Sequence, residues 1–259
     1  MKQGDFSALA KHYHNRPAYP LSLMKYILQI AGYGTKTDFA IADIGAGTGK
    51  MTAVLGSGAP KAKIIAVEPN DEMRAEGKKA VTCAEFIKGS AEATTLASSS
   101  MDFACMASSF HWSDHTKSLP EFRRILKPNG IFCAIWNARQ INSDEILQSI
   151  ENEIKAMIPT LSRVSSGLQN TKDWQSVLTS TGDFKDCVYM QMPYTETMSK
   201  ERYIGAWKSV NDIQAQAISY GGGEQLWNDI LKMIEEKIKN KDSITQHYTI
   251  KAFVATSTK

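Results

Sequence analysis

The stretch Ile41–Gly49, I-A-D-I-G-A-G-T-G, carries the clearest structural signal in this chain of 259 residues. It begins as a short apolar run, which suits a buried strand. Glycines then recur at alternate positions, Gly45, Gly47 and Gly49, and a sequence that can form a helix begins at Lys50. Glycine has no Cβ, so the backbone can reverse tightly there and a ligand can lie against it. We therefore predict a strand, a glycine turn and a helix, which together open a doubly wound sheet.

The spacing of the glycines distinguishes two kinds of nucleotide-binding loop. The dinucleotide fingerprint is G-x-G-x-x-G, but here the third glycine comes one residue earlier and Lys50 takes the place of the dinucleotide glycine. Glu68 ends the next β-branched run, 23 residues after Gly45, where a carboxylate can accept both hydrogens of a ribose diol. The spacing disfavours a nicotinamide-dependent oxidoreductase. An ordinary tight turn and a solvated Glu68 are the alternatives.

Composition limits the classes of function. The chain is 42% hydrophobic and 22% charged, with a net charge of +3, which is ordinary for a globular protein and too mild for a nucleic-acid partner. The first residues lack an apolar signal region, and no apolar stretch approaches about 20 residues, so we expect neither a secretory signal nor a membrane span. The four cysteines lack a C-x-x-C pair, which indicates a reducing, cytoplasmic location and no zinc site; they are Cys83, Cys105, Cys133 and Cys187.

The order of elements predicts the fold class. Expected strands and helices alternate up to residue 137, which indicates parallel βαβ units in an α/β fold. Two helical insertions, about 138–183 and 194–242, then precede a closing strand over Ile244–Thr256. We expect residues 1–137 to form N-terminal helices and the cofactor-binding half. Residues 138–259 would complete the same domain, with the insertions as a cap above the carboxyl edge of a mostly parallel sheet.

Four ordered motifs carry a resemblance to a known family. They read I-A-D-I-G-A-G-T-G, I-I-A-V-E-P-N-D-E-M, F-H-W-S-D-H and E-F-R-R-I-L-K-P-N-G-I-F-C-A-I-W-N. Together they resemble the class I S-adenosylmethionine-dependent methyltransferases, in particular the small-molecule group of ubiquinone-biosynthesis-type and trans-aconitate-methyltransferase-like enzymes. Residues 13–20, Y-H-N-R-P-A-Y-P, are similar to the opening of the latter. The resemblance covers about residues 5–137. It implies a Rossmann-like methyltransferase fold with a seven-stranded sheet, S-adenosyl-L-methionine as cofactor, S-adenosyl-L-homocysteine as product, and a monomer or homodimer.

The same resemblance implies which residues hold the cofactor. The glycine turn would border its methionine part, with Asp43 orienting the turn or the amino group, and Glu68 would hold the ribose hydroxyls. Met73 as plain helix core, Arg16 as a surface cation and Ser108 as a strand-end residue are the alternatives for three of the positions. The full implied set is Asp43, Gly45, Ala46, Gly47, Thr48 and Gly49 at the turn, Glu68, Pro69, Met73, Ala91 and Glu92 around ribose and adenine, Ser108 beneath the sulfonium, and Tyr13 and Arg16 closing over the cofactor.

Candidate catalytic residues follow the fourth expected strand. Methyl transfer from a sulfonium is an in-line displacement, for which the protein supplies alignment and exclusion of water. A general base helps if the acceptor is a hydroxyl or a protonated amine, and His111 is the candidate, with Trp112 as a wall of the acceptor pocket. Alternatively, His111 only orders its loop, or it joins Asp114 and His115 as metal ligands; we expect no metal.

The acceptor site is predicted from the later part of the chain. Tyr203 and Trp207 are four residues apart in an expected helix and so share one face. We predict that they face the acceptor opposite His111. The acceptor would be a small molecule methylated on oxygen, on nitrogen or on a carboxylate. A catalytically idle, cofactor-binding partner protein on the same fold is the alternative to an enzyme.

Overall fold

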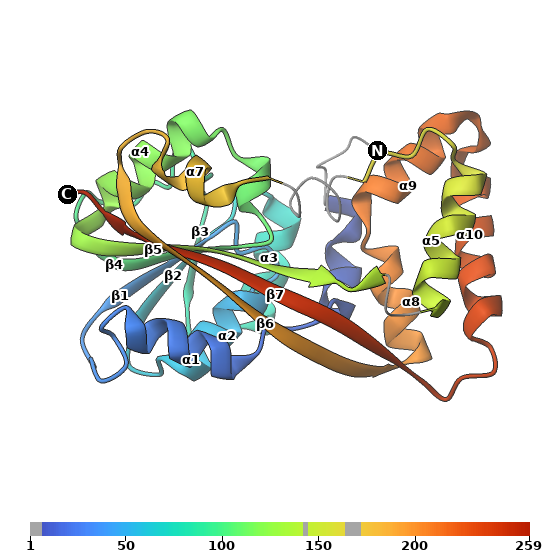
Figure 1. Ribbon diagram of the computed structural model, residues 1–259, viewed down its shortest axis with the longest axis horizontal. Coiled ribbons are helices and arrows are strands. Elements are labelled where there is room, and N and C mark those ends of the chain that lie inside the picture. The colour runs from blue at the N-terminus through green and yellow to red at the C-terminus, as the bar shows by residue number, and fades with distance from the viewer. Residues whose placement is uncertain (1–6, 142–144, 164–171) are drawn as a thin grey trace. The chain divides into compact units, whose positions relative to one another are not determined.

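The computed structural model describes residues 7–141, 145–163 and 172–259, which belong to two compact units (Figure 1). The first, called here the sheet unit, consists of Ala18–Asn137, Asp173–Met192 and Ile250–Lys259. The second, the helical unit, comprises the described parts of Met1–Pro17, Ala138–Lys172 and Pro193–Thr249. The described residues 7–17 group with the helical unit.

A seven-stranded sheet runs in the order β3-β2-β1-β4-β5-β7-β6. Strands β1 to β5 are parallel, with Ile44 of β1 beside Val67 of β2 and Asp43 of β1 beside Cys105 of β4. The bonds from Asn129 N to Lys259 O and from Gln140 N to His247 O join β5 and β7 in opposite residue order, so this pair is antiparallel. The predicted fold class is confirmed. The strands are β1 (Ala40–Ile44), β2 (Lys63–Val67), β3 (Glu85–Ile87), β4 (Met101–Ala107), β5 (Leu126–Arg139), β6 (Phe184–Ser199) and β7 (Ser243–Ser257).

Helices cover both faces of the sheet. Figure 1 shows α1 and α2 on one face and α4 and α7 on the other. Central strands covered on both faces must be apolar throughout, and four of the five residues of β1 and of β2 are buried. Asn70 caps α3 by accepting the amide of Met73 at 2.9 Å. The helices of this unit are α1 (Leu21–Ile30), α2 (Lys50–Gly58), α3 (Asp71–Ala80), α4 (His115–Ile125) and α7 (Trp174–Thr179), with a 3₁₀ turn, η2, at Phe110–Trp112.

One expected cap helix belongs to the sheet unit instead. Trp174, the first residue of α7, stacks on Trp136 of β5 with ring centroids 4.6 Å apart. Phe110 packs against Trp174 at 5.5 Å, and all three side chains are buried in the main hydrophobic core. Residues 173–183, which were expected in the first insertion, group with the sheet unit. The Trp174 side chain buries a large apolar surface against the sheet, and this burial holds α7 in the sheet unit.

The helical unit has a core of its own. Leucine, isoleucine and aromatic side chains from α5, α8, α9 and α10 form one buried cluster. The 3₁₀ helix η1 contacts α8, where Arg202 Nε donates to Asn15 O at 3.2 Å. The first of the expected N-terminal helices is thus a 3₁₀ helix that begins at Ser7 within the described residues. The elements are η1 (Ser7–Asn15), α5 (Glu145–Met157), α8 (Lys200–Lys208), α9 (Asn211–Ala217), a π turn, η5 (Ile218–Gly222), and α10 (Gly223–Ile238).

Candidate functional site

The predicted glycine turn lies where the strand order reverses. The sheet runs from β1 to β2 and β3 in one direction and from β1 to β4 and β5 in the other. In doubly wound sheets ligands bind at the carboxyl ends of the strands flanking such a reversal. The glycine turn follows β1, and the segment 108–112 follows β4. Ser109 Oγ donates to Ile44 O at 3.2 Å, so the two segments are in contact.

The backbone of the turn requires glycine. Gly45, Gly47 and Gly49 have φ angles of 68°, 58° and 83°, in the left-handed region that side chains disfavour. A Cβ on Gly45 would lie 2.8 Å from Ser109 Oγ, and one on Gly49 would lie 2.6 Å from Val81 Cγ2. The turn therefore combines an unusual conformation with close packing. Its two intervening residues, Ala46 and Thr48, are themselves buried.

Asp43 is a buried carboxyl group directly before the turn. Its side chain is inaccessible to solvent, and Oδ2 accepts a hydrogen bond from Thr52 Oγ1 at 2.5 Å. Burial raises the pKa of Asp43 to about 7, and the negative charge of Glu68 adds to the effect. Within the described part of the chain, Oδ1 has no hydrogen-bond partner. A buried carboxyl oxygen without a partner fits a ligand that carries a hydrogen-bond donor or a positive charge.

Glu68 connects the end of β2 to the glycine turn. Its Oε2 accepts the amide of Gly47 at 2.7 Å, and its Oε1 accepts the amide of Asn70 at 2.9 Å. The side chain is buried, which raises the pKa of Glu68 although both amides favour its charged form. Carboxylate oxygens have further lone pairs, so Glu68 can still accept from ribose hydroxyls. The two backbone amides therefore hold the Glu68 carboxylate in place, and it is not a solvated surface group.

The other two residues predicted beside Glu68 differ in exposure. Met73 is buried at the start of α3, and its methyl group lies 3.2 Å from where a Cβ on Gly47 would stand. Met73 therefore lines the glycine turn. The same contact also packs α3 against this turn, as expected of a plain core residue. Pro69 is exposed at the end of β2.

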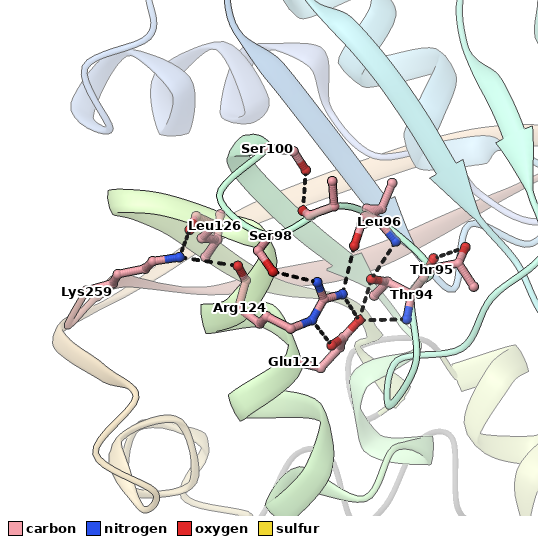
Figure 2. Close-up of polar contacts among 10 residues, drawn as sticks. Thr94, Thr95, Leu96, Ser98, Ser100, Glu121, Arg124, Leu126 and Lys259 are labelled. Atoms are coloured by element: carbon pink, nitrogen blue, oxygen red, sulfur yellow. Dashed lines mark hydrogen bonds and ion pairs between the residues drawn. The ribbon is translucent and has the colours of Figure 1, made fainter.

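A charged network holds the loop after β3, which contains Ala91 and Glu92. Figure 2 shows the Glu121 carboxylate accepting from the Thr94 amide at 2.8 Å and pairing with Arg124 through two contacts of 2.7 and 2.8 Å. Arg124 also donates to Leu96 O at 2.8 Å. A two-point arginine–carboxylate pair is directional and fixes the groups that it joins. Helix α4 thereby anchors this loop.

Ala91 and Glu92 themselves face different surroundings. Ala91 is buried in the main core, as a residue packed against the sheet would be. Glu92 Oε1 accepts the amide of Asp114 at 2.9 Å, so Glu92 lies at the start of α4. The structure thus brings the loop after β3 and the start of α4 together, which sequence separation alone does not reveal.

Ser108 contacts a residue that sequence reasoning did not place in the site. Tyr19 Oη and Ser108 Oγ are 2.6 Å apart, and Ser108 has a positive φ of 51°. Nearby, Asn137 Nδ2 donates to Ala18 O at 3.3 Å. Two hydrogen bonds thus tie residues 18 and 19 to the carboxyl ends of β4 and β5. The tyrosine stands inside the Y-x-x-R-P-x-Y-P motif, so the signal was present in the sequence.

His111 and Trp112 lie in η2, directly after β4. Trp136 Nε1 donates to His111 Nδ1 at 3.1 Å, a contact between distant segments that no local sequence pattern indicates. Trp112 is 40% exposed, with its ring centroid 5.1 Å from that of His111. An exposed indole beside the imidazole is compatible with a pocket wall. The His111 ring is oriented by the buried indole of Trp136.

The alternative metal site is not supported. His115 Nε2 lies 3.2 Å from Phe110 O, and Asp114 accepts the Thr116 amide at 3.1 Å as the N-cap of α4. His111, Asp114 and His115 therefore each contact a different group and do not converge on one point. Within residues 7–141, 145–163 and 172–259, no three His, Cys, Asp or Glu side chains gather as metal ligands would.

Four of the predicted site residues lie in the helical unit. The Arg16 guanidinium donates to Ser209 Oγ at 2.8 Å and Ser209 O at 2.7 Å, and it lies 4.6 Å from the centroid of the Tyr13 ring. Tyr203 and Trp207 are 1% and 2% exposed and pack edge to face in the core of that unit. Their burial fits core residues better than walls of an acceptor pocket. The roles of Tyr13 and Arg16 toward the cofactor stay predictions.

Comparison with known proteins assigns the fold to a family. Residues 42–134 match the family model described as a methyltransferase domain. An uncharacterized methyltransferase of Mycobacterium tuberculosis is 32% identical over 133 residues, which is 51% of this chain and 51% of that protein. Residues 42–134 of the chain are therefore a methyltransferase domain. The family predicted from the sequence motifs is thereby confirmed.

More distant relatives extend over most of this methyltransferase chain. A malonyl-[acyl-carrier protein] O-methyltransferase of Paenibacillus is 25% identical over 240 residues, covering 87% of this chain and 85% of that protein. A putative type II methyltransferase from Anaeromyxobacter dehalogenans shares the fold, with a TM-score of 0.66 and 17% identity over 93% of this chain and 97% of that one. The chain spans about half the length of the first curated relatives that it matches. In the described part of the chain, no helix has the length and apolar character to cross a membrane.

Proposed function

We propose that this methyltransferase transfers the methyl group of S-adenosylmethionine to a small-molecule acceptor by in-line displacement. The observation that carries the proposal is the 2.7 Å hydrogen bond from the Gly47 amide to Glu68. It joins the glycine turn after β1 to the carboxylate after β2, the two positions that a nucleoside ligand must contact together. An ordinary tight turn would not need a buried glutamate bonded to its central amide.

The residues present fit that cofactor. Gly45 and Gly49 have positive φ angles and leave no room for a Cβ, because Ser109 and Val81 pack against them, so the turn depends on glycine. Glu68 is in place to accept ribose hydroxyls, and the Asp43 carboxyl has an oxygen available for the amino group, directly or through water. When bound, the cofactor supplies a methyl group already activated on a sulfonium. The protein's own task is then to align the acceptor with that methyl group and to exclude water.

The acceptor is proposed to be a small molecule methylated on oxygen, with a carboxylate as the favoured class and nitrogen as the alternative. The Paenibacillus relative, whose name describes an O-methyltransferase, supports oxygen because its similarity extends over most of both chains. The free state of Cys83, Cys105, Cys133 and Cys187 supports a reducing, cytoplasmic location.

The experiment is turnover of S-adenosylmethionine labelled in its methyl group. The purified protein is incubated with panels of carboxylic acids, phenols and amines, and label transferred to each acceptor is counted. We expect transfer to at least one acceptor, with loss of transfer in Glu68→Ala. Cofactor binding without transfer to any panel would favour the idle partner protein. Saturable NAD binding without S-adenosylhomocysteine binding would overturn the proposal.

A further inference from the structure

We propose that Trp136 fixes His111 as a neutral hydrogen-bond donor, so that His111 positions an anionic acceptor oxygen and does not act as a general base. The proposal rests on the proposed methyl transfer and names the class of acceptor. It starts from the 3.1 Å hydrogen bond between Trp136 Nε1 and His111 Nδ1.

The indole determines the tautomer of the imidazole. A tryptophan Nε1–H can only donate, so the atom facing it must offer a lone pair. In the neutral imidazole one nitrogen carries hydrogen and the other carries the lone pair. Since His111 Nδ1 accepts from Trp136, the hydrogen is on Nε2. The basic lone pair of His111 is then the one that already holds the indole hydrogen.

The Trp136 indole cannot easily move away from the lone pair on His111 Nδ1. Trp136 is 2% exposed and stacks on Trp174 at 4.6 Å with an interplanar angle of 25°. Phe253 meets the Trp136 ring edge to face at 6.0 Å. Close-packed side chains of this size have few alternative rotamers. To take up a proton at Nδ1, the imidazole would have to give up the Trp136 hydrogen bond and face its N–H with another N–H.

The other ring nitrogen points away from the indole. The two nitrogens of an imidazole are on different sides of the ring, so a ring with Nδ1 toward the core directs Nε2–H away from Trp136. His111 belongs to η2 after β4, beside the exposed Trp112 and in the segment whose Ser109 packs on the glycine turn. His111 Nε2 is itself shielded from solvent, so an acceptor oxygen that it binds near the transferable methyl group would be held away from water.

A donor without a base suits an oxygen that is already ionised at neutral pH, and a carboxylate meets that condition. A lone pair of the carboxylate oxygen forms the new O–CH₃ bond while the S–CH₃ bond breaks and its electron pair stays on sulfur. A sulfonium and a carboxylate become a neutral thioether and a neutral ester. No proton is released, so no base is needed. A phenol or an ammonium acceptor would leave a proton for which His111 has no available lone pair.

The tautomer can be measured without any acceptor. Long-range proton–nitrogen correlation NMR of protein labelled with ¹⁵N-histidine distinguishes the two neutral tautomers, and comparison with His111→Gln assigns the signals. We expect the Nε2–H pattern for His111 in the wild type and a mixture of tautomers in Trp136→Phe. An Nδ1–H pattern in the wild type would overturn the proposal. Because the NMR measurement needs no turnover, its result does not depend on whether methyl transfer is observed.

The role is tested by replacing His111 with two amides and with alanine. A glutamine amide nitrogen can reach the place of Nε2, whereas an asparagine nitrogen stands nearer that of Nδ1. We expect His111→Gln to keep kcat for a carboxylic acid within about tenfold of wild type, while His111→Ala and His111→Asn lose about tenfold more. S-adenosylhomocysteine affinity should be unchanged in all three. Equal loss of kcat in all three, together with turnover of phenols or amines only, would overturn the proposal and identify His111 as a base.

Discussion

Replacing Asp43 with asparagine should stabilise the protein at alkaline pH. Burial raises the pKa of Asp43 to about 7 in the folded state, from an ordinary value of 3.8. Between these two values the folded protein holds a proton that the unfolded chain has lost. The free energy of unfolding contributed by Asp43 therefore falls as pH rises from about 4 to about 7, and asparagine removes this dependence because it does not ionise.

The size of the effect follows from the shift. About three pKa units at 1.36 kcal/mol each give up to about 4 kcal/mol between pH 4 and pH 8. Asparagine has nearly the same shape, and its Oδ1 can accept the hydrogen bond that Thr52 Oγ1 gives to Asp43. The packing is thus nearly unchanged, and the difference between Asp43→Asn and wild type isolates the ionisation.

The assay is guanidinium unfolding followed by tryptophan fluorescence at several pH values from 4.5 to 8.5, since the sheet unit contains Trp112, Trp136 and Trp174. Asp71→Asn is the control, because a hydrogen bond from Arg74 lowers the pKa of Asp71, and this carboxyl group is therefore largely ionised in both the folded and the unfolded chain throughout the pH series. Asp43→Asn should gain stability relative to wild type as pH rises, whereas the stability difference of Asp71→Asn should stay nearly constant. A stability difference for Asp43→Asn that is the same at every pH would refute the reasoning.

Three further predictions concern affinity and packing. Glu68→Ala should weaken S-adenosylhomocysteine binding by about 1–3 kcal/mol, measured by calorimetry, because a charged hydrogen-bond acceptor is lost; unchanged affinity would remove Glu68 from the site. Gly49→Ala should lower the free energy of unfolding by about 1–3 kcal/mol more than Gly182→Ala, because both have positive φ but only Gly49 meets Val81; equal losses in denaturant titrations would contradict the packing. Trp207→Ala should cost about 3–5 kcal/mol in the same assay, as expected of a buried core tryptophan, and a stable variant with altered acceptor KM would restore its predicted pocket role.

Local signals predicted the cofactor half of the fold. Alternate glycines after an apolar run, and a β-branched run before Glu68, are patterns within a few residues, so the sequence alone predicted β1, β2 and the helix between them. The helix start expected at Lys50 is the first residue of α2, and the β-branched run before Glu68 forms β2, which ends at Val67. The carboxylate at the end of β2 was found in the same way, since its distance from the glycines is fixed by one helix and one strand.

Long-range packing escaped prediction for a different reason. Trp174 reads as part of a helical insertion, but its ring stacks on Trp136, from which it is separated by 38 residues of sequence. The contacts of Tyr19 with Ser108 and of Trp136 with His111 likewise join distant segments. Hydrophobic periodicity shows that such residues are buried but not what they bury against. For that reason the sequence suggested His111 as a base, whereas its hydrogen-bond partner is visible only in the structure.

Titration calorimetry of the wild-type protein with S-adenosylhomocysteine and, separately, with NAD tests the central claim most directly. If the glycine turn and Glu68 form a site for S-adenosylmethionine, S-adenosylhomocysteine should bind saturably at one site per chain and NAD should give no binding heat. Saturable binding of NAD, with no binding of S-adenosylhomocysteine, would contradict the account.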